Sequence, residues 1–207
     1  MRVIDLGLTR YKDVWEKQRE LHSLRVTGQI PDTLILTEHF PVYTLGIRGN
    51  QGNIIAKQAF LDSRQIEVVR SDRGGDVTCH VPGQVVGYPI IDLKQHKTSA
   101  AWYMRSLEKV LIMTLAQWGI EAVRDPKFTG VWVGADKIAA LGVRISRLVT
   151  MHGFALNVNC DLDYFKGIIP CGIADRGVTS LKKVLGHSVN IDGVKKTIIS
   201  SFKQVFP

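Results

Sequence analysis

The sequence predicts a single α/β domain that spans residues 1–207. Segments with helical spacing alternate with short β-branched runs along the chain, and no linker, repeat or low-complexity stretch divides it. Hydrophobic residues make up 45% and charged residues 22%, which is the composition of a globular protein and excludes a disordered one. A chain of 207 residues can also bury a sizeable core.

Three segments have the apolar spacing of amphipathic helices, and one short segment has the pattern of a single helical turn. The three helices are expected at Thr9–Thr27, Ser99–Gln117 and Asn190–Phe206, and the single turn at Asp161–Phe165. Thr98 or Ser99 is the expected N-cap of the longest helix. Its apolar stripe predicts that it covers one face of a sheet.

The strands are predicted from runs of β-branched and aromatic residues bounded by turn residues. They are Thr33–Thr37, Val42–Leu45, Ile66–Val69, Val85–Ile91, Val131–Val133, Lys137–Ser146 and Val149–Asn157. Two short hairpin connections separate the last three runs.

The first candidate site is the loop Arg73–Gln84, which lies between two predicted strands. It contains paired glycines, a Pro-Gly step, an arginine that can bind an anion and a titratable histidine. A decorated hairpin turn is the ordinary interpretation, but this combination favours a pocket wall. A second loop, Gly46–Asn53, either binds an anion or only turns the chain, because it matches neither the P-loop nor the dinucleotide spacing.

The three cysteines, Cys79, Cys160 and Cys171, contain no CxxC pair and form neither a disulfide framework nor a zinc motif. Cys171 lies on a Pro-Cys-Gly bend, which presents a thiol rather than packing it. A nucleophilic cysteine needs a nearby base.

The candidate bases are Lys137, His80 and His152, although Lys137 opens a strand beside a turn, where a lysine is normally solvated. A Cys–Lys pair suits acyl transfer through a thioester. Peptide hydrolysis by a Cys–His pair is the alternative, and the chain lacks the papain and caspase signatures.

The formal charge of +8 favours acidic partners, either nucleic acid or an acidic carrier protein. The basic residues are scattered, with no zinc-finger or RNA-recognition signature, so no nucleic-acid partner is expected. No apolar run approaches the roughly 20 residues that cross a bilayer. The N-terminus also lacks a signal-peptide pattern, so we expect a cytoplasmic protein without a membrane partner.

Several motifs in one order resemble the LipB-type octanoyltransferases, also called lipoyl(octanoyl) transferases. The most specific is Arg73-Gly74-Gly75-x-x-Thr78-x-His80-x-Pro82-Gly83-Gln84. The others, in chain order, are Glu38-His39 with Tyr43-Thr44-Leu45-Gly46, Gly130-Val131-Trp132-Val133-Gly134 with Lys137-Ile138, Leu141-Gly142-Val143-Arg144, His152-Gly153-Phe154-Ala155-Leu156-Asn157, Pro170-Cys171-Gly172 and Val178-Thr179-Ser180-Leu181. The resemblance covers nearly the whole chain.

The resemblance implies a biotin/lipoate ligase-like fold, with a mixed β-sheet flanked by helices. The implied activity is transfer of an octanoyl group from octanoyl-acyl carrier protein to a lysine of a lipoyl domain. The implied acceptors are the lipoyl domains of 2-oxoacid dehydrogenase E2 subunits and the glycine cleavage H protein. No cofactor and no metal is implied.

Site residues follow from the resemblance position by position. Cys171 would be the acyl-thioester nucleophile and Lys137 its acid/base partner. The acyl pocket would be lined by Arg73, Gly74, Gly75, Asp76, Val77, Thr78, Cys79, His80, Ala140, Leu141, Gly142, Gly153, Phe154 and Ala155.

This chain has Cys79-His80-Val81 where the family usually has an aromatic residue followed by His-Gly. Val81 disfavours φ > 0, so either the loop does not need that conformation or the pocket is reshaped. Cys79 is a second thiol beside His80 and hence a rival nucleophile. Two further functions stay open: an ATP-dependent lipoate- or biotin-type ligase of the same fold, and a non-catalytic carrier- or nucleic-acid-binding module.

Overall fold

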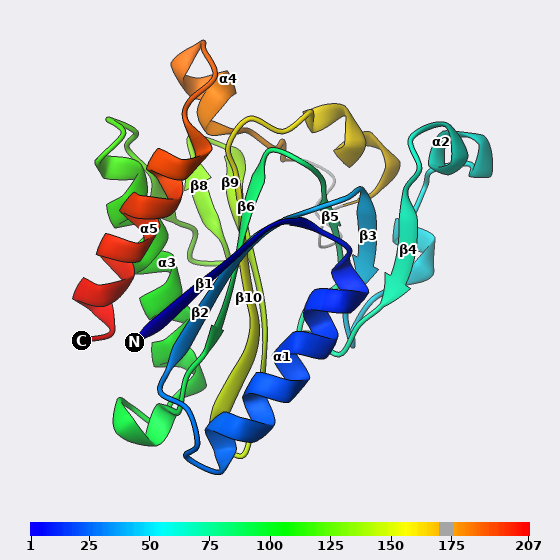
Figure 1. The fold of residues 1–207 in the computed structure, drawn as a ribbon. Coiled ribbons are helices and arrows are strands. Elements are labelled where there is room, and N and C mark those ends of the chain that lie inside the picture. Colours follow the sequence, from blue (N-terminus) through cyan, green and yellow to red (C-terminus); the bar gives the residue numbers. More distant parts are fainter. Residues whose placement is uncertain (170–175) are drawn as a thin grey trace.

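The computed structural model describes residues 1–169 and 176–207, which form two β-sheets with flanking helices (Figure 1). The strands are β1 (Arg2–Thr9), β2 (Thr33–His39), β3 (Val42–Leu45), β4 (Glu67–Arg70), β5 (Val77–His80), β6 (Gln84–Ile90), β7 (Val123–Arg124), β8 (Val131–Val133), β9 (Asp136–Ser146) and β10 (Val149–Asn157). Among the described residues the larger sheet has the order β1-β2-β6-β10-β9-β8-β7, and the smaller has the order β4-β3-β5.

The sheets are mixed, as the resemblance implied. β1 with β2 and β3 with β4 are parallel pairs, whereas the other adjacent strands are antiparallel. All seven strands predicted from sequence are confirmed, with ends that shift by at most two residues. The turn between β9 and β10 places Arg147 (φ 52°) and Leu148 (φ 62°) in the left-handed region, as two-residue hairpins of right-twisted strands favour.

Helices cover both faces of the larger sheet, and one short helix, Gln58–Ser63, lies beside the smaller sheet (Figure 1). They are α1 (Tyr11–Val26), α2 (Gln58–Ser63), α3 (Ala100–Ala116), α4 (Leu181–Leu185) and α5 (Ile191–Val205), with 3₁₀ turns η1 (Gln51–Asn53), η2 (Leu93–Gln95) and η3 (Leu162–Gly167). The three predicted long helices and the predicted turn are confirmed, and the Ser99 side chain caps α3 by accepting from the backbone of Trp102. The described residues contain no helix with the length and apolarity to cross a membrane.

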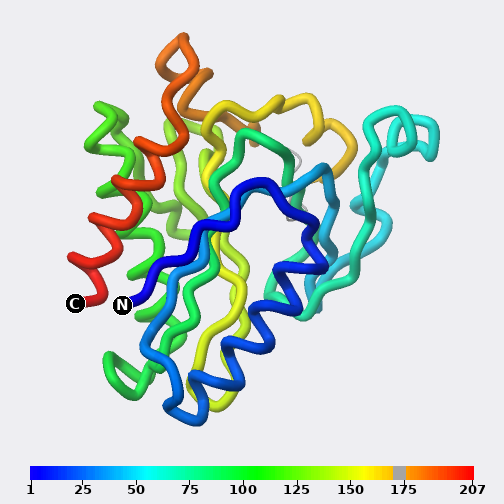
Figure 2. The backbone as a smooth tube through the Cα atoms, in the orientation of Figure 1, coloured from blue at the N-terminus to red at the C-terminus, as the bar shows by residue number. Residues whose placement is uncertain are grey.

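Two apolar cores lie between the larger sheet and the helices, one on each face of the sheet. α3 and α5 cover one face of the sheet with the larger core, and α1 covers the opposite face with the second (Figure 1). The two ends of the chain lie close together on the α5 side of the sheet (Figure 2). Both faces of β6 and β10 are therefore buried, which explains why these strands are apolar runs rather than alternating ones.

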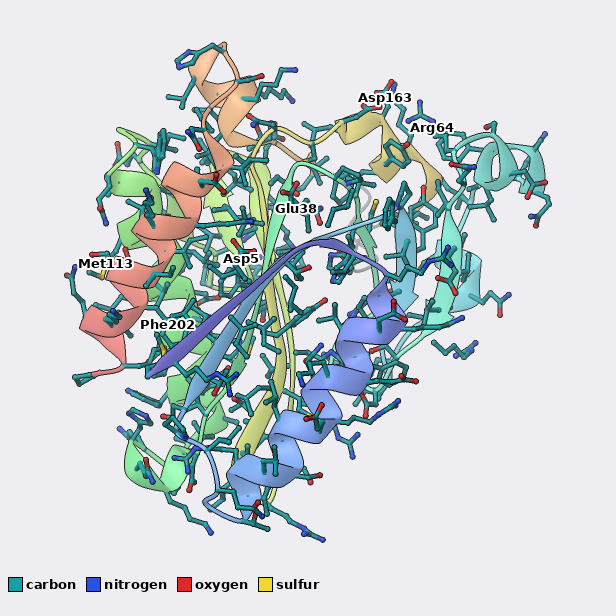
Figure 3. All side chains as sticks on the ribbon, in the orientation of Figure 1. Asp5, Glu38, Arg64, Met113, Asp163 and Phe202 are labelled. Atoms are coloured by element: carbon teal, nitrogen blue, oxygen red, sulfur yellow. The ribbon has the colours of Figure 1, made fainter. Side chains whose placement is uncertain are left out.

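The smaller sheet forms a third core together with the segment around η3. Arg64, after α2, joins these parts because its guanidinium donates to Asp161 at 3.1 Å and lies 4.6 Å from the ring centroid of Tyr164. Figure 3 shows Arg64 beside Asp163 at this junction. Val81 lies in this core and has no positive φ, so the loop does not need the left-handed conformation there.

Sequence patterns did not reveal β1, β5, β7, α2 and α4. β1 is an edge strand whose alternation is broken by a register shift between Asp5 and Leu8, with Gly7 at φ +64°. β5 lies inside the glycine loop and has four residues, so its alternation is too short to recognise.

Candidate active site

A cavity lies between the glycine loop with β5 on one side and the middle of β9 and β10 on the other. Its lining includes every predicted pocket residue except Gly74 and Cys79. The residues that sequence analysis did not assign to it are Tyr11, Val86, Tyr88 and His152. Gly74 lines an adjoining cavity. Segments from four parts of the chain thus converge on one space.

Backbone contacts fix the glycine loop beside β9. Gly74 donates to the carbonyl of Val143 at 2.9 Å, and Gly46 donates to that of Asp76 at 3.0 Å. Gly75 has φ +92°, and a Cβ added at Gly46 would collide with the Gly75 carbonyl oxygen. The loop beginning at Gly46 therefore turns the chain against the glycine loop. Close backbone approach requires glycine at position 46, and the left-handed backbone favours it at position 75.

Arg73, predicted as an anion-binding side chain, is buried and holds the loop. Its guanidinium donates to Oγ1 of Thr44 at 2.9 Å and to the carbonyls of Gly74 at 3.1 Å and Asp76 at 2.8 Å. Bonds from a charged donor to several backbone acceptors order a loop strongly. Arg73 also lines the cavity, so its charge acts on neighbouring titratable groups.

One end of the cavity, here called the inner end, is lined by the rings of Tyr11, His80, Tyr88 and His152, with His39 packed behind them. Tyr11 stacks on His80 with centroids 5.9 Å apart, and His39 packs edge-on against His80 at 5.7 Å. His39 Nε2 and the Tyr88 hydroxyl are 2.7 Å apart. The rings come from α1, β2, β5, β6 and β10, so only the fold brings them together.

His152 completes this end wall from β10. Its backbone has φ +55°, which is strained for a non-glycine residue, and its Nε2 lies 2.7 Å from Asp72 Oδ1. The peptide N–H of His152 donates to the Gln18 side chain at 2.7 Å, which holds this conformation. Strain of this kind persists where surrounding contacts determine it, and it is frequent at functional sites.

Burial keeps the three histidines uncharged at neutral pH. Desolvation lowers the pKa of His39 to about 4 and that of His152 to about 3, with the Arg73 charge adding to the effect on His152. Desolvation also lowers the pKa of His80 well below its usual value, helped by His39 and Arg73. The inner wall is therefore polar but neutral.

This wall predicts acid sensitivity. Between pH 6.5 and pH 4 the unfolded chain binds protons that the folded His39 does not, so stability falls as pH falls through this window. His39 alone is expected to cost about 2 kcal/mol at pH 5 relative to pH 7. Urea unfolding at both pH values measures this difference. His39→Gln should reduce this difference, and His187→Gln, at an exposed position after α4, should not. An equal difference in all three proteins would contradict the account.

Lys137 lies next to this cavity at the start of β9. It is 7% exposed, its Nζ is 4.8 Å from the ring centroid of Trp132, and it lines two adjoining cavities, one shared with Gly74 and a smaller one. Ala140 lines all three spaces. The expectation of a solvated edge position is wrong, because β9 is paired on both sides and the segment after residue 176 covers Lys137.

Gly130 and the chain near residue 178 shape the surroundings of Lys137. Gly130 has φ +139°, and a Cβ there would lie 3.1 Å from Cε of Lys137. Lys137 donates its backbone N–H to Gly177 O at 3.0 Å, and Thr179 donates to Lys137 O at 3.0 Å. Backbone of these two segments thus flanks the lysine.

The cysteines have different placements. Cys171, the predicted nucleophile, lies outside the described residues. Cys79 is fully buried in the core of the smaller sheet and does not reach the cavity. Burial raises the pKa of Cys79 well above its usual value and that of Cys160 to about 12, so neither thiol readily forms a thiolate.

Gln84 and Asn157 are further site residues that sequence analysis did not assign. Both line the smaller cavity with Lys137, and both are polar residues within buried strands. A buried amide inside an apolar run is unusual, and this signal in the sequence could have indicated them.

Comparison with known proteins shows which family the chain is similar to. The family model described as the lipoyl protein ligase A/B catalytic domain matches residues 10–203. An octanoyltransferase of Rubrobacter xylanophilus is 51% identical over 201 residues, which cover 96% of this chain and 90% of the relative. One of Gloeobacter violaceus is 48% identical, with 99% and 89% covered.

Solved structures show the same fold at low identity. A bipartite lipoate protein ligase from Thermoplasma acidophilum superimposes with a TM-score of 0.73 at 16% identity, covering 99% of this chain and 83% of that one. A biotin protein ligase from Aquifex aeolicus gives 0.56 at 14% identity, with 99% and 68% covered. The chain therefore belongs to the lipoyl protein ligase A/B catalytic-domain family, and it is an acyltransferase that moves octanoyl groups for protein lipoylation.

Proposed function

We propose that the chain transfers octanoyl from octanoyl-acyl carrier protein to a lysine of a lipoyl domain, with Cys171 as nucleophile and Lys137 as acid and base. The acceptors are lipoyl domains of 2-oxoacid dehydrogenase E2 subunits and the glycine cleavage H protein. The placement of Lys137 carries the proposal. It is a buried amine at the junction of the cavities, and its backbone is bonded to Gly177 and Thr179, shortly after Cys171 in the chain.

In the first half-reaction Lys137 takes the proton of the Cys171 thiol. The thiolate attacks the octanoyl carbonyl carbon, a new C–S bond forms, and the bond to the carrier sulfur breaks. The departing carrier thiolate receives the proton from Lys137, so the carrier leaves as a free thiol. The octanoyl group is then a thioester on Cys171.

In the second half-reaction the neutral amine of the acceptor lysine attacks this thioester. The C–N bond forms as the C–S bond breaks, and Cys171 leaves as a thiolate. Lys137 accepts the proton that the attacking nitrogen loses and later returns it to the thiolate. The sequence of steps consumes no ATP and needs no redox partner.

The cavity suits an alkyl chain. Val77, Leu141 and Phe154 supply apolar surface, and the glycines of the loop and of β9 leave room beside the backbone. At the inner end an alkyl chain can pack against the uncharged histidines without leaving a histidine charge buried and unsolvated. These features support Arg73, Gly74, Gly75, Asp76, Val77, Thr78, His80, Ala140, Leu141, Gly142, Gly153, Phe154 and Ala155 as the acyl-binding wall, and Cys79 as its buried support.

The basic surface suits an acidic carrier. Arg48 and Lys127 are exposed at the cavity that also contains Lys137, on a chain of net charge +8. Reversing both charges is expected to raise KM for octanoyl-acyl carrier protein about tenfold at low salt, with the effect shrinking at high salt. Reversal of Lys196 and Lys203 on α5 is the control. An equal KM in both double variants would refute carrier docking at this mouth.

ATP dependence separates the proposal from its alternatives. The purified protein is incubated with octanoyl-acyl carrier protein and a lipoyl domain, without ATP, and in parallel with free octanoate and ATP. Transfer only from the carrier thioester supports the proposal. Transfer only from octanoate with ATP would establish that the protein is an ATP-dependent ligase. No transfer in either mixture would favour the non-catalytic binding module.

A further inference from the structure

A buried line of hydrogen bonds runs from the glycine loop to the chain beside Lys137. His80 Nδ1 and Gln84 Oε1 are 3.2 Å apart. The Gln84 amide donates to Asn157 Oδ1 at 2.9 Å and to the carbonyl of Cys79 at 3.0 Å. Asn157 Nδ2 then donates to the carbonyl of Thr179 at 2.9 Å.

The line ends at the backbone of Lys137. Thr179 donates its N–H to the Lys137 carbonyl, and Gly177 accepts from the Lys137 N–H, both at 3.0 Å. Gly177 packs so closely on the Asp136 carboxylate that a Cβ there would collide with it. Asn157 therefore holds segment 177–179 from one side through the Thr179 carbonyl, and the Lys137 backbone pairs with the same segment from the other side.

The direction of each bond in the line is determined. Gln84 uses its amide nitrogen for Cys79 and Asn157, so its oxygen faces His80, and Nδ1 of the neutral imidazole carries the proton. Gln84 is 1% and Asn157 is 5% exposed, and they are direct cross-strand partners on β6 and β10. A fully satisfied buried pair of this kind specifies one arrangement of its neighbours.

We propose that Asn157 is a positioning residue for octanoyl transfer, which holds segment 177–179, a few residues after Cys171 in the sequence, against Lys137. The inference rests on the proposed roles of Cys171 and Lys137. Without the Asn157 amide, residue 179 loses the bond that fixes it from the β10 side. Segment 177–179 then keeps its two backbone bonds to Lys137 but loses its anchor on β10, so its position is less tightly fixed. Misplacement of reacting groups by about 1 Å costs roughly 100-fold in rate.

Asn159 provides a matched control two residues along the chain. Its amide also ties a distant segment, donating to Val189 O at 2.8 Å and accepting from Val189 N at 3.0 Å. Residue 189 leads into α5 and lines none of the cavities around Lys137. Asn157→Leu and Asn159→Leu thus remove similar anchors, one near the site and one away from it.

The experiment compares kcat, KM for octanoyl-acyl carrier protein, and melting temperature of both variants. Asn157→Leu is expected to lower kcat about 10- to 100-fold with KM within about threefold, whereas Asn159→Leu lowers the melting temperature without this loss of kcat. Equal kcat values in the two variants would overturn the inference. If Asn157→Leu does not fold, Asn157→Ser against Asn159→Ser decides in the same way.

A parallel Cys171→Ser variant separates this inference from the proposed function. Loss of transfer in Cys171→Ser with unchanged kcat in Asn157→Leu would overturn the positioning role alone. Full transfer by Cys171→Ser would overturn the proposed function and this inference together. Loss in Cys171→Ser with a selective fall of kcat in Asn157→Leu supports both.

Discussion

Replacement of Lys137 by methionine is expected to lower octanoyl transfer about 10²- to 10⁴-fold, the usual contribution of a positioned acid or base. Methionine retains the length of the side chain and its packing against Gly130 and Trp132, but it has no proton to exchange. Steady-state kcat and single-turnover acylation of the protein measure the effect. Both half-reactions should slow, because each needs a proton transfer.

Lys182→Met is the matched control for this result. Lys182 is an exposed lysine of α4 that lines neither of the cavities around Lys137. Its loss should change kcat less than about twofold, as expected for a surface charge. A Lys137→Met protein that stays folded and keeps more than a tenth of wild-type kcat would refute the acid/base role.

Ala140→Leu is expected to lower kcat/KM for the octanoyl donor about 10- to 100-fold, from the roughly 1–3 kcal/mol that overfilling a packed space costs. Ala140 lines all three cavities, so added methyl groups take space that the acyl chain needs. Shorter acyl donors should be affected less, because they need less of this space. A series from butanoyl to octanoyl thioesters measures the dependence.

Ala135→Leu controls for the added hydrophobic volume, because Ala135 lies exposed in the turn between β8 and β9. It should leave the whole series unchanged. A uniform loss for all chain lengths in Ala140→Leu would show that the substitution disturbs β9 rather than the acyl space, and would contradict the assignment of this cavity to the acyl chain.

The strands and long helices could be predicted because their signal is local. Alternation and turn residues located the hairpins of β8 to β10 to within a residue, and the stripe on α3 indicated its buried face. Short or interrupted elements were not predicted. Examples are β5 inside the glycine loop and β1 with its register shift at Gly7. In these cases pairing partners, not the segment itself, determine the structure.

The candidate site, too, could be predicted only in part from local sequence patterns. The environment of Lys137 is built by Trp132, Gly130 and the distant segment 177–179, so its burial is invisible in the local pattern of a strand opening beside a turn. Lys137 was one of three candidate bases, and only the family resemblance favoured it over the histidines. The Asn157 contact with Thr179 likewise joins residues 22 positions apart. Such contacts follow from topology, which composition and periodicity do not encode.

The histidine cluster shows why the role expected of a residue from the sequence can differ from its role in the structure. His39, His80 and His152 lie on three strands, and nothing in their local spacing predicts that they meet. His80 and His152 were candidate bases for a thiol. Their lowered pKa values make them neutral wall residues, a role that follows from burial.

The most direct test of the account is the mass of the intact protein after incubation with octanoyl-acyl carrier protein in the absence of ATP. The account predicts one octanoyl adduct, labile to hydroxylamine, present in Cys79→Ser and absent in Cys171→Ser. An adduct that persists in Cys171→Ser and disappears in Cys79→Ser would contradict it by placing the nucleophile in the smaller sheet. Transfer that proceeds without any covalent adduct under single-turnover conditions would contradict the thioester route itself.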